Sequence, residues 1–243
     1  MRSDATPAAT TLADGSCAVT ICLAGALTRG DGANPTLERL CDTLPGIHKE
    51  CSEDRCYSIF SMFQKPQVVA TLLGALDSDR NGVVDDSDRA CTVSLVGYSW
   101  GGVNAIEVAS EIATHPKFTG KRQQIDRVVL VDPFAPHAVP TLEISANVVK
   151  LWEYRHSVAP ADDCSNEAPL GPYLGLPPLC SEGSRCQDYD YSQHPDTTFS
   201  GQRGEFRGSD VGHCNIVAHV APAIRRNIAS GEDGKAVPPP VTK

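Results

Sequence analysis

The chain has 243 residues, a net charge of −9 at pH 7 and a hydrophobic content of 41%. One α/β domain of this length can bury a full core, and this composition excludes an intrinsically disordered chain. The acidic balance argues against nucleic acid as a partner, because proteins that bind the phosphate backbone need clustered Lys and Arg. No apolar run reaches the roughly 18 residues of a membrane-spanning helix, so the sequence predicts no transmembrane segment.

Ten cysteines are the unusual feature of the composition. Their number is even, and no Cys-x-x-Cys pair occurs, so the usual zinc and thioredoxin signatures are missing. Disulfides are the favoured interpretation and imply an oxidising compartment, with buried free thiols as the alternative. The early apolar stretch at 18–27 follows Asp4 and Asp14 instead of a basic cluster, which is not typical of a signal peptide. We therefore expect a secreted protein, extracellular or periplasmic, in its mature form.

Hydrophobic patterning predicts strands that alternate with helices along most of the chain. The expected elements are a strand at 18–23, a helix at 35–44, a strand at 56–62, a helix at 66–76, a strand at 91–96, a helix at 102–114, strands at 125–131 and 147–152, and a helix at 216–228. Such alternation predicts an α/β fold, in which helices cover both faces of a mostly parallel sheet.

The rest of the chain lacks a clear period. Residues 1–16 are small and polar, so we expect a flexible N-terminal arm before a domain at 17–230. The segment 155–206 holds three cysteines among many Pro, Gly and Ser residues, which is typical of a lid or an insertion. Residues 231–243 include three consecutive prolines, and we expect a disordered tail there.

The most informative motif is Gly-Tyr-Ser-Trp-Gly at 97–101, between a predicted strand and a predicted helix. A Gly-x-Ser-x-Gly pattern in this context is typical of a nucleophile elbow, a sharp turn that exposes the serine hydroxyl above the sheet. Glycines two residues to either side allow the strand and the helix to approach closely. Ser99 is therefore the candidate nucleophile, and an ordinary Gly/Ser turn is the alternative.

On this motif the chain resembles the α/β-hydrolase superfamily, and within it the lipase and esterase branch, over about residues 17–230. The resemblance implies a triad in the order Ser, acid, His, with two backbone N–H groups that bind the oxyanion. One N–H would belong to Trp100, which follows the nucleophile. The other would belong to Ala26, with Leu27 as second choice, because Ala24-Gly25-Ala26 stands where many lipases have His-Gly-x.

In such a triad the histidine precedes the last helix. His213 fits, since a glycine comes before it and an apolar helical pattern follows. His219 falls inside that helix, and His194 lies in the irregular segment, so both fit less well.

The acid is the least constrained member of the triad. Asp132 directly follows the strand after the nucleophile helix, where lipases of the pancreatic type carry their acid. Most of the superfamily places the acid one strand later, which would select Glu153, Asp162 or Asp163. We take Asp132 as the candidate and keep the later carboxylates as alternatives.

A second motif occupies 77–88, Asp-Ser-Asp-Arg-Asn-Gly-Val-Val-Asp-Asp-Ser-Asp. Oxygen donors recur along it, and a glycine holds position 6, as a wrapped Ca²⁺ loop requires. The loop resembles an EF-hand or dockerin loop, although its twelfth residue is Asp instead of Glu and a strand follows it. The candidate ligands of a structural Ca²⁺ are Asp77, Asp79, Asn81, Val83 through its carbonyl, Asp85 and Asp88. A solvated acidic turn is the alternative.

Together these motifs predict a secreted serine hydrolase that cleaves carboxylic esters of small molecules or lipids. A thioesterase or an amidase would use the same triad. A calcium-dependent binding module on a catalytically silent hydrolase fold is a third possibility, but dockerin-like partner sites normally need two such loops and the chain has one.

Overall fold

The computed structural model describes residues 10–11, 16–25, 35–51, 56–61, 63–134, 143–155, 185–191, 213 and 216–232. Its elements are β1 (Thr10–Thr11), β2 (Cys17–Leu23), α1 (Pro35–Cys41), β3 (Glu50–Cys51), β4 (Cys56–Tyr57), α2 (Lys65–Leu76), β5 (Cys91–Tyr98), α3 (Trp100–Thr114), the 3₁₀ helix η1 (Gly120–Gln123), β6 (Ile125–Val131), β7 (Val148–Arg155), β8 (Cys186–Asp190) and α4 (Ile216–Ser230).

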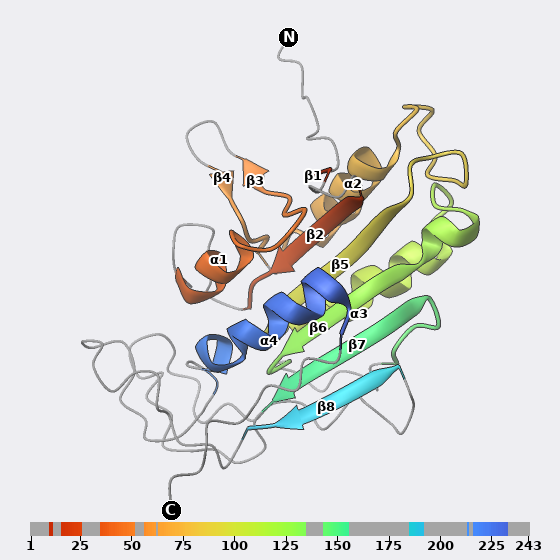
Figure 1. Ribbon diagram of the computed structural model, residues 1–243. Helices are drawn as coiled ribbons and strands as arrows, with labels where there is room; N and C mark the ends of the chain where they lie inside the picture. The colour runs from red at the N-terminus through yellow and green to blue at the C-terminus, as the bar shows by residue number, and fades with distance from the viewer. Residues whose placement is uncertain are drawn as a thin grey trace, which may run out of the picture.

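The main sheet has the strand order β1-β2-β5-β6-β7-β8. Its last five strands are parallel, and the two-residue β1 is antiparallel to β2. The strands β2, β5, β6, β7 and β8 lie side by side and point the same way (Figure 1). The carboxyl ends of the central strands β5 and β6 therefore meet at one edge, where polar groups from both can converge.

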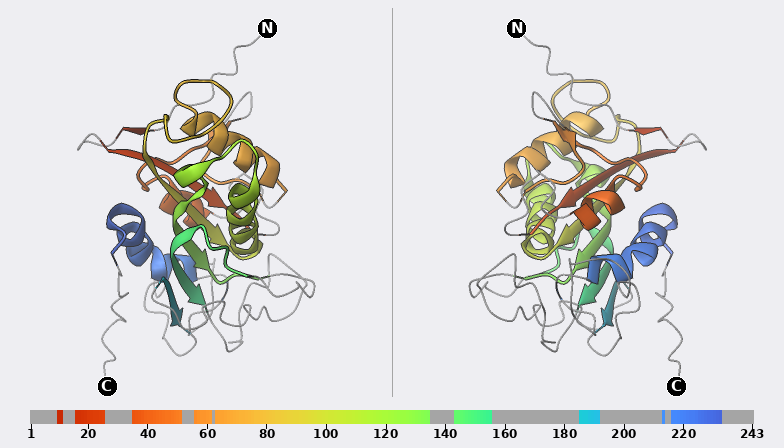
Figure 2. Two further views of the ribbon diagram at one scale, coloured as in Figure 1. Left: turned by 90° about the vertical axis from the view of Figure 1, so that its right-hand side faces the viewer. Right: turned by 90° about the vertical axis from the view of Figure 1, so that its left-hand side faces the viewer.

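Helices cover both faces of this sheet, as expected from the alternating pattern. The views in Figure 2 show α3 on one side of the sheet and α4 on the other. The core on the first side contains buried residues of α2 and α3, whereas the core on the second contains residues of α1 and α4. Successive strand residues alternate between the two cores: Leu130 faces α3, and Val131 faces α4. The protein is thus an α/β protein with a mostly parallel, doubly covered sheet.

Three elements differ from the sequence-based expectation. The strand expected at 56–62 is only two residues long and pairs with β3 in a separate hairpin, while Phe60 forms a single bridge to β2. A short strand, β1, lies within the expected N-terminal arm. The strand β8 lies within the segment expected to lack regular structure, and its polar sequence hides it from hydrophobic patterning.

Disulfides join β2 to its neighbours. Cys17 bonds to Cys91, its register partner on β5, and Cys22 bonds to Cys41 at the end of α1. Cys186 also carries a disulfide, and no free cysteine occurs in the part of the chain that the structure describes. Cys17, Cys22, Cys41, Cys91 and Cys186 therefore form disulfides, as the sequence predicted.

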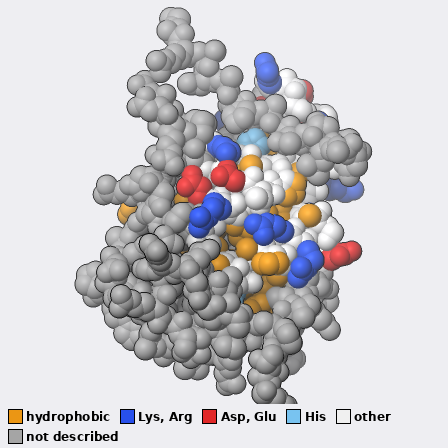
Figure 3. Space-filling view, turned by 60° about the vertical axis from the view of Figure 1, so that its left-hand side comes forward, with side chains coloured by type: hydrophobic (Ala, Val, Ile, Leu, Met, Phe, Trp, Pro, Cys, Tyr) orange, Lys and Arg blue, Asp and Glu red, His pale blue; other side chains and the backbone are white. Residues whose placement is uncertain are grey.

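The face over α1 and α4 carries basic, acidic and hydrophobic side chains next to one another (Figure 3). Arg225 of α4 donates a hydrogen bond from Nε to Thr43 Oγ1 at 2.9 Å, which connects α4 to the turn after α1.

Among the described residues, no helix combines the length and the apolar character needed to cross a membrane.

Candidate functional site

The turn between β5 and α3 places Ser99 in a strained conformation at the edge of the sheet. Its φ is 56° and its ψ −129°, in a region that non-glycine residues rarely adopt. The flanking glycines are required by space: a Cβ at Gly97 would collide with the backbone of Gly101, and a Cβ at Gly101 would collide with the backbone of Leu23. The motif therefore folds as a sharp, strained turn between a strand and a helix, the local geometry expected of a nucleophile elbow.

Three side chains from separate parts of the chain meet at this edge. His213 Nε2 lies 3.0 Å from Ser99 Oγ, and His213 Nδ1 is hydrogen-bonded to Asp132 Oδ2. In the tautomer that this arrangement favours, the serine hydroxyl donates to Nε2 and the Nδ1–H donates to the carboxylate. All three residues are at least 95% buried. The low polarity around them strengthens both hydrogen bonds.

Asp132 occupies a second strained position. It follows β6, is completely buried and has a φ of 46°. The backbone N–H of Ser99 donates to Val131 O at 2.9 Å, which connects the turn at Ser99 to the residue before Asp132. Strained residues persist only where the surrounding structure holds them, and they cluster at functional sites.

Of the other candidate acids, only Glu153 lies within the described residues. Glu153 is buried in β7, where it pairs with Leu130 of β6. Leu130 lies two residues before Asp132. Hydrogen bonds join the His213 ring to Asp132 and to Ser99. Asp162 and Asp163 lie outside the described residues.

The expected oxyanion groups are described in part. Trp100 is the first residue of α3 and is half-buried beside the nucleophile. Ala26 and its alternative Leu27 lie outside the described residues. Gly25, the neighbour of Ala26, touches the nucleophile so closely that a Cβ there would lie 2.8 Å from Ser99 Oγ. Gly25, the last described residue after β2, thus lies next to the Ser99 hydroxyl.

Two aromatic residues that sequence reasoning did not select surround the histidine. Tyr98 stacks on the His213 ring with a centroid distance of 5.0 Å, and Phe134 meets the same ring edge-on at 6.2 Å. Tyr98 belongs to the motif, but nothing in the local pattern shows that its ring turns toward a residue 115 positions later. These rings form the apolar surroundings of the imidazole.

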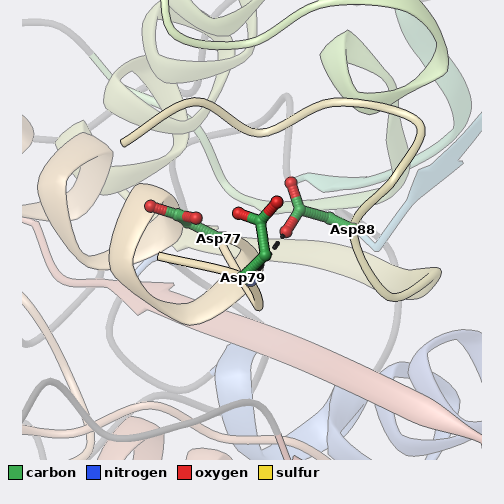
Figure 4. Close-up of side chains that lie close together, drawn as sticks. All are labelled: Asp77, Asp79 and Asp88. Carbon is green, nitrogen blue, oxygen red and sulfur yellow. Dashed lines mark hydrogen bonds between the residues drawn. The ribbon is translucent and has the colours of Figure 1, made fainter. Parts of the chain in front are cut away.

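The second candidate site is the loop between α2 and β5. Oxygen atoms of Asp77, Asp79 and Asp88 all lie within 4.8 Å of one another. Figure 4 shows these three carboxylates close together on the loop. They hold positions 1, 3 and 12 of the predicted Ca²⁺ loop, so residues at both ends of the motif do converge.

Hydrogen bonds within the loop hold all three of these carboxylates. Asp77 accepts backbone N–H groups of Asn81 and Gly82, at 3.0 and 2.8 Å. Asp88 accepts the backbone N–H of Ser78 at 2.6 Å and that of Asp85 at 2.9 Å. Burial raises the pKa of Asp88, but these hydrogen bonds outweigh it and leave the pKa below its ordinary value.

The remaining predicted ligands are arranged differently. Asp85 accepts hydrogen bonds from the backbone N–H and the hydroxyl of Ser87, and it is not part of the converging group. Asn81 Oδ1 accepts the N–H of Val83 at 2.8 Å, while its amide nitrogen donates to Asp79 at 2.9 Å. Three of the six predicted residues thus form a compact cluster of hard oxygen donors, the class of ligand that Ca²⁺ prefers.

Two groups of side chains thus converge in the described structure: Ser99, Asp132 and His213 at the edge of the sheet, and the carboxylates of the loop 77–88. Ser99 and Asp132 directly follow the neighbouring strands β5 and β6, and His213 precedes α4. In comparisons with known proteins, the chain matches no protein-family model, no curated protein and no solved structure.

Proposed function

We propose that the protein is a secreted serine hydrolase that cleaves carboxylic esters. The observation that carries this proposal is the His213 ring, which bridges Ser99 Oγ on one side and Asp132 Oδ2 on the other. A buried carboxylate that orients an imidazole, which in turn contacts a strained serine, has the parts of a nucleophilic acyl-transfer catalyst. The disulfides support export, because such bonds persist in oxidising compartments.

The proposed reaction begins when Ser99 Oγ attacks the ester carbonyl and His213 Nε2 takes the hydroxyl proton. The carbonyl π electrons move to oxygen, and the N–H groups of Trp100 and Ala26 stabilise the resulting oxyanion. As the tetrahedral intermediate collapses, the C–O bond to the alcohol breaks and His213 returns the proton to the leaving oxygen. Water then attacks the acyl-serine with the same histidine as base, which releases the acid and restores Ser99.

Asp132 stays ionised through this cycle and stabilises the imidazolium that forms at each proton transfer. Its complete burial also holds the imidazole in one orientation. The N-terminus of α3 begins directly after Ser99 and adds its dipole to the stabilisation of developing negative charge.

A fluorophosphonate probe tests this proposal, because it labels an activated serine and not an ordinary one. We expect wild-type protein to be labelled at Ser99 and to hydrolyse short p-nitrophenyl esters. Ser99→Ala should abolish both and lower turnover by about a million-fold, while its circular dichroism spectrum stays unchanged. Ser110→Ala is the control, since Ser110 lies exposed on α3. A folded wild-type protein that resists the probe would instead indicate a binding module.

The same triad serves thioesters and amides, so the acyl-transfer class needs its own measurement. Turnover of an ester, a thioester and an amide with one common acyl group separates the three. We expect the ester to have the highest kcat/KM. A large preference for the thioester or the amide would replace esterase with the corresponding alternative.

We further propose that the loop 77–88 holds a structural Ca²⁺. The support is the convergence of Asp77, Asp79 and Asp88 from the two ends of the loop. When bound, the ion would offset the repulsion between these carboxylates. The loop joins α2 to the start of β5, at the opposite end of that strand from Ser99. The expected role is therefore to stabilise the fold.

A further inference from the structure

The geometry points to Tyr98 as the residue that positions His213 for catalysis, through a hydrogen bond to its backbone and a stacking contact with its ring. This inference rests on the proposed serine-hydrolase function. It assigns a role to the residue directly before the nucleophile, whose side chain the triad itself does not use.

The first contact fixes the backbone of the histidine. Tyr98 Oη donates to the carbonyl oxygen of His213 at 2.9 Å, and both groups are buried. Tyr98 is the last residue of β5 and is paired with Val131 of β6, so its backbone is held within a central strand of the sheet. The hydrogen bond thus connects a residue outside the sheet to a rigid strand.

The second contact fixes the plane of the imidazole. The rings of Tyr98 and His213 are stacked, with an interplanar angle of 26° and centroids 5.0 Å apart. Hydrogen bonds to Ser99 and Asp132 set the direction of the two ring nitrogens but still allow the ring to tilt. A parallel ring on one face and the edge of Phe134 on another restrict that tilt.

The carboxyl end of β5 therefore carries both the proposed nucleophile, Ser99, and the residue that positions the proposed base, His213. Because Tyr98 and Ser99 are consecutive, any movement of β5 carries both groups together. The distance between Ser99 Oγ and His213 Nε2 is then set mainly by local geometry. Productive proton transfer is sensitive to misplacement of about 1 Å, which can lower a rate by about a hundred-fold.

Two substitutions separate the two contacts. Tyr98→Phe removes the hydrogen bond and keeps the ring, and Tyr98→Leu removes both. Tyr154→Phe is the matched control, because the buried Tyr154 hydroxyl donates to Asn227 Oδ1 of α4 at 2.6 Å. The backbone carbonyl of Tyr154, which accepts the N–H of Asp132, is unchanged by this substitution.

The measurements are kcat and KM for a short p-nitrophenyl ester, the rate of fluorophosphonate labelling and the melting temperature. We expect Tyr98→Phe to lower kcat about tenfold and Tyr98→Leu about a hundred-fold, with KM within about twofold of wild type. Labelling rates should fall in parallel with kcat. Tyr154→Phe should lower the melting temperature while leaving kcat and labelling at wild-type values.

The outcomes distinguish this inference from the proposed function. A wild-type protein that is not labelled overturns the proposed function and the role of Tyr98 with it. A labelled wild type together with unchanged kcat in folded Tyr98→Phe and Tyr98→Leu overturns the positioning role alone. The positioning role is also overturned if the activity of the variants falls only in proportion to the amount of folded protein. Tyr98→Phe is nearly isosteric, so the test stands even where Tyr98→Leu fails to fold.

Discussion

The backbone of Gly25 lies directly against the side chain of Ser99, although 74 residues separate them in the chain. A Cβ at position 25 would be 2.5 Å from Ser99 Cβ and 2.8 Å from Ser99 Oγ. Gly25 does not have a positive φ, so its backbone conformation suits other residues as well. A larger side chain is excluded by the proximity of Ser99 and, at 3.2 Å from the Cβ, of the Tyr98 carbonyl oxygen.

Gly25→Ala is therefore expected to impair catalysis more than folding. The new methyl group has to displace the serine hydroxyl, and a displacement near 1 Å lowers a rate by about a hundred-fold. We expect kcat to fall by that order and the melting temperature to change by only a few degrees. Ester hydrolysis and thermal unfolding of the same preparation provide the two measurements. A variant with wild-type kcat would show that the nucleophile does not need this space.

Asp132→Asn tests the assignment of the acid. The amide has nearly the same shape but favours the wrong imidazole tautomer, so we expect turnover to fall by about ten-thousand-fold. Glu153→Gln, Asp162→Asn and Asp163→Asn should remain near wild type. A folded Asp132→Asn protein with substantial activity, together with an inactive variant at one of the other three positions, would move the acid to the later site.

His48 should make the stability of the protein depend on pH. Its ring is buried, and neither ring nitrogen has a hydrogen-bond partner within the described residues. Burial lowers the pKa of His48 from 6.5, so below that pH the unfolded chain binds a proton that the folded protein does not. The free energy of unfolding should therefore fall as the pH falls from 6.5 toward the lower, folded-state pKa.

Urea unfolding at about pH 7 and about pH 5 measures this effect. His48→Leu removes the titrating group, so the variant should lose less stability than wild type over this interval. His219→Gln, at a half-buried position of α4, is the control and should keep the wild-type dependence. An equal pH dependence in wild type and His48→Leu would assign the effect to other groups.

Removal of Ca²⁺ should lower the melting temperature without an immediate loss of activity. An ion at a hundred times its Kd stabilises the folded state by about 2.7 kcal/mol, which corresponds to about 5–10 °C for a chain of this size. EDTA should cause this decrease, and Ca²⁺ should reverse it more fully than Mg²⁺, which requires a tighter octahedral site. Differential scanning calorimetry measures both.

The comparison of two loop variants makes the calcium test specific. Asp77→Ala should abolish the response to EDTA, because Asp77 belongs to the converging carboxylates. Asp86→Ala should retain it, since Asp86 is exposed on the same loop and outside that group. An unchanged melting curve on chelation would identify the loop as an acidic turn, and an instant loss of activity would place the ion near the triad.

The elements that local patterns specify were predicted well. The buried strand at 17–23, the helix ending at Leu76 and the elbow at Ser99 each combine a run of apolar residues with a clear turn or cap. The apolar runs, turns and caps of these elements are local in sequence, so a single chain is enough to recognise them. The structure also brings His213 and Asp132 to Ser99, but that expectation came from the resemblance to α/β-hydrolases and not from a local pattern.

Relationships between distant residues were not predictable in the same way. The polar strand β8 exists because it pairs with β7, where Arg155 and Asp188 form an ion pair at 2.8 Å. The ring of Tyr98 meets His213 only after the sheet and α4 are assembled. Asp85 lies outside the acidic cluster because a local bond to Ser87 competes for its carboxylate. The strand β8 and the Tyr98–His213 contact depend on tertiary packing. The position of Asp85 depends on a competing hydrogen bond, which the spacing of residues in the sequence does not reveal.

The Cys17–Cys91 disulfide turns the first third of the protein into a covalent ring. It closes a segment of 74 residues that contains α1, the β3–β4 hairpin, α2 and the acidic loop. A protease that cuts one peptide bond inside this ring leaves β2 and β5 joined at their amino-terminal ends. The nicked protein would run as one full-length chain without reductant and as two fragments with it. Gly25 and Ser99, at the opposite ends of these strands, would thus stay on one molecule after such a cut.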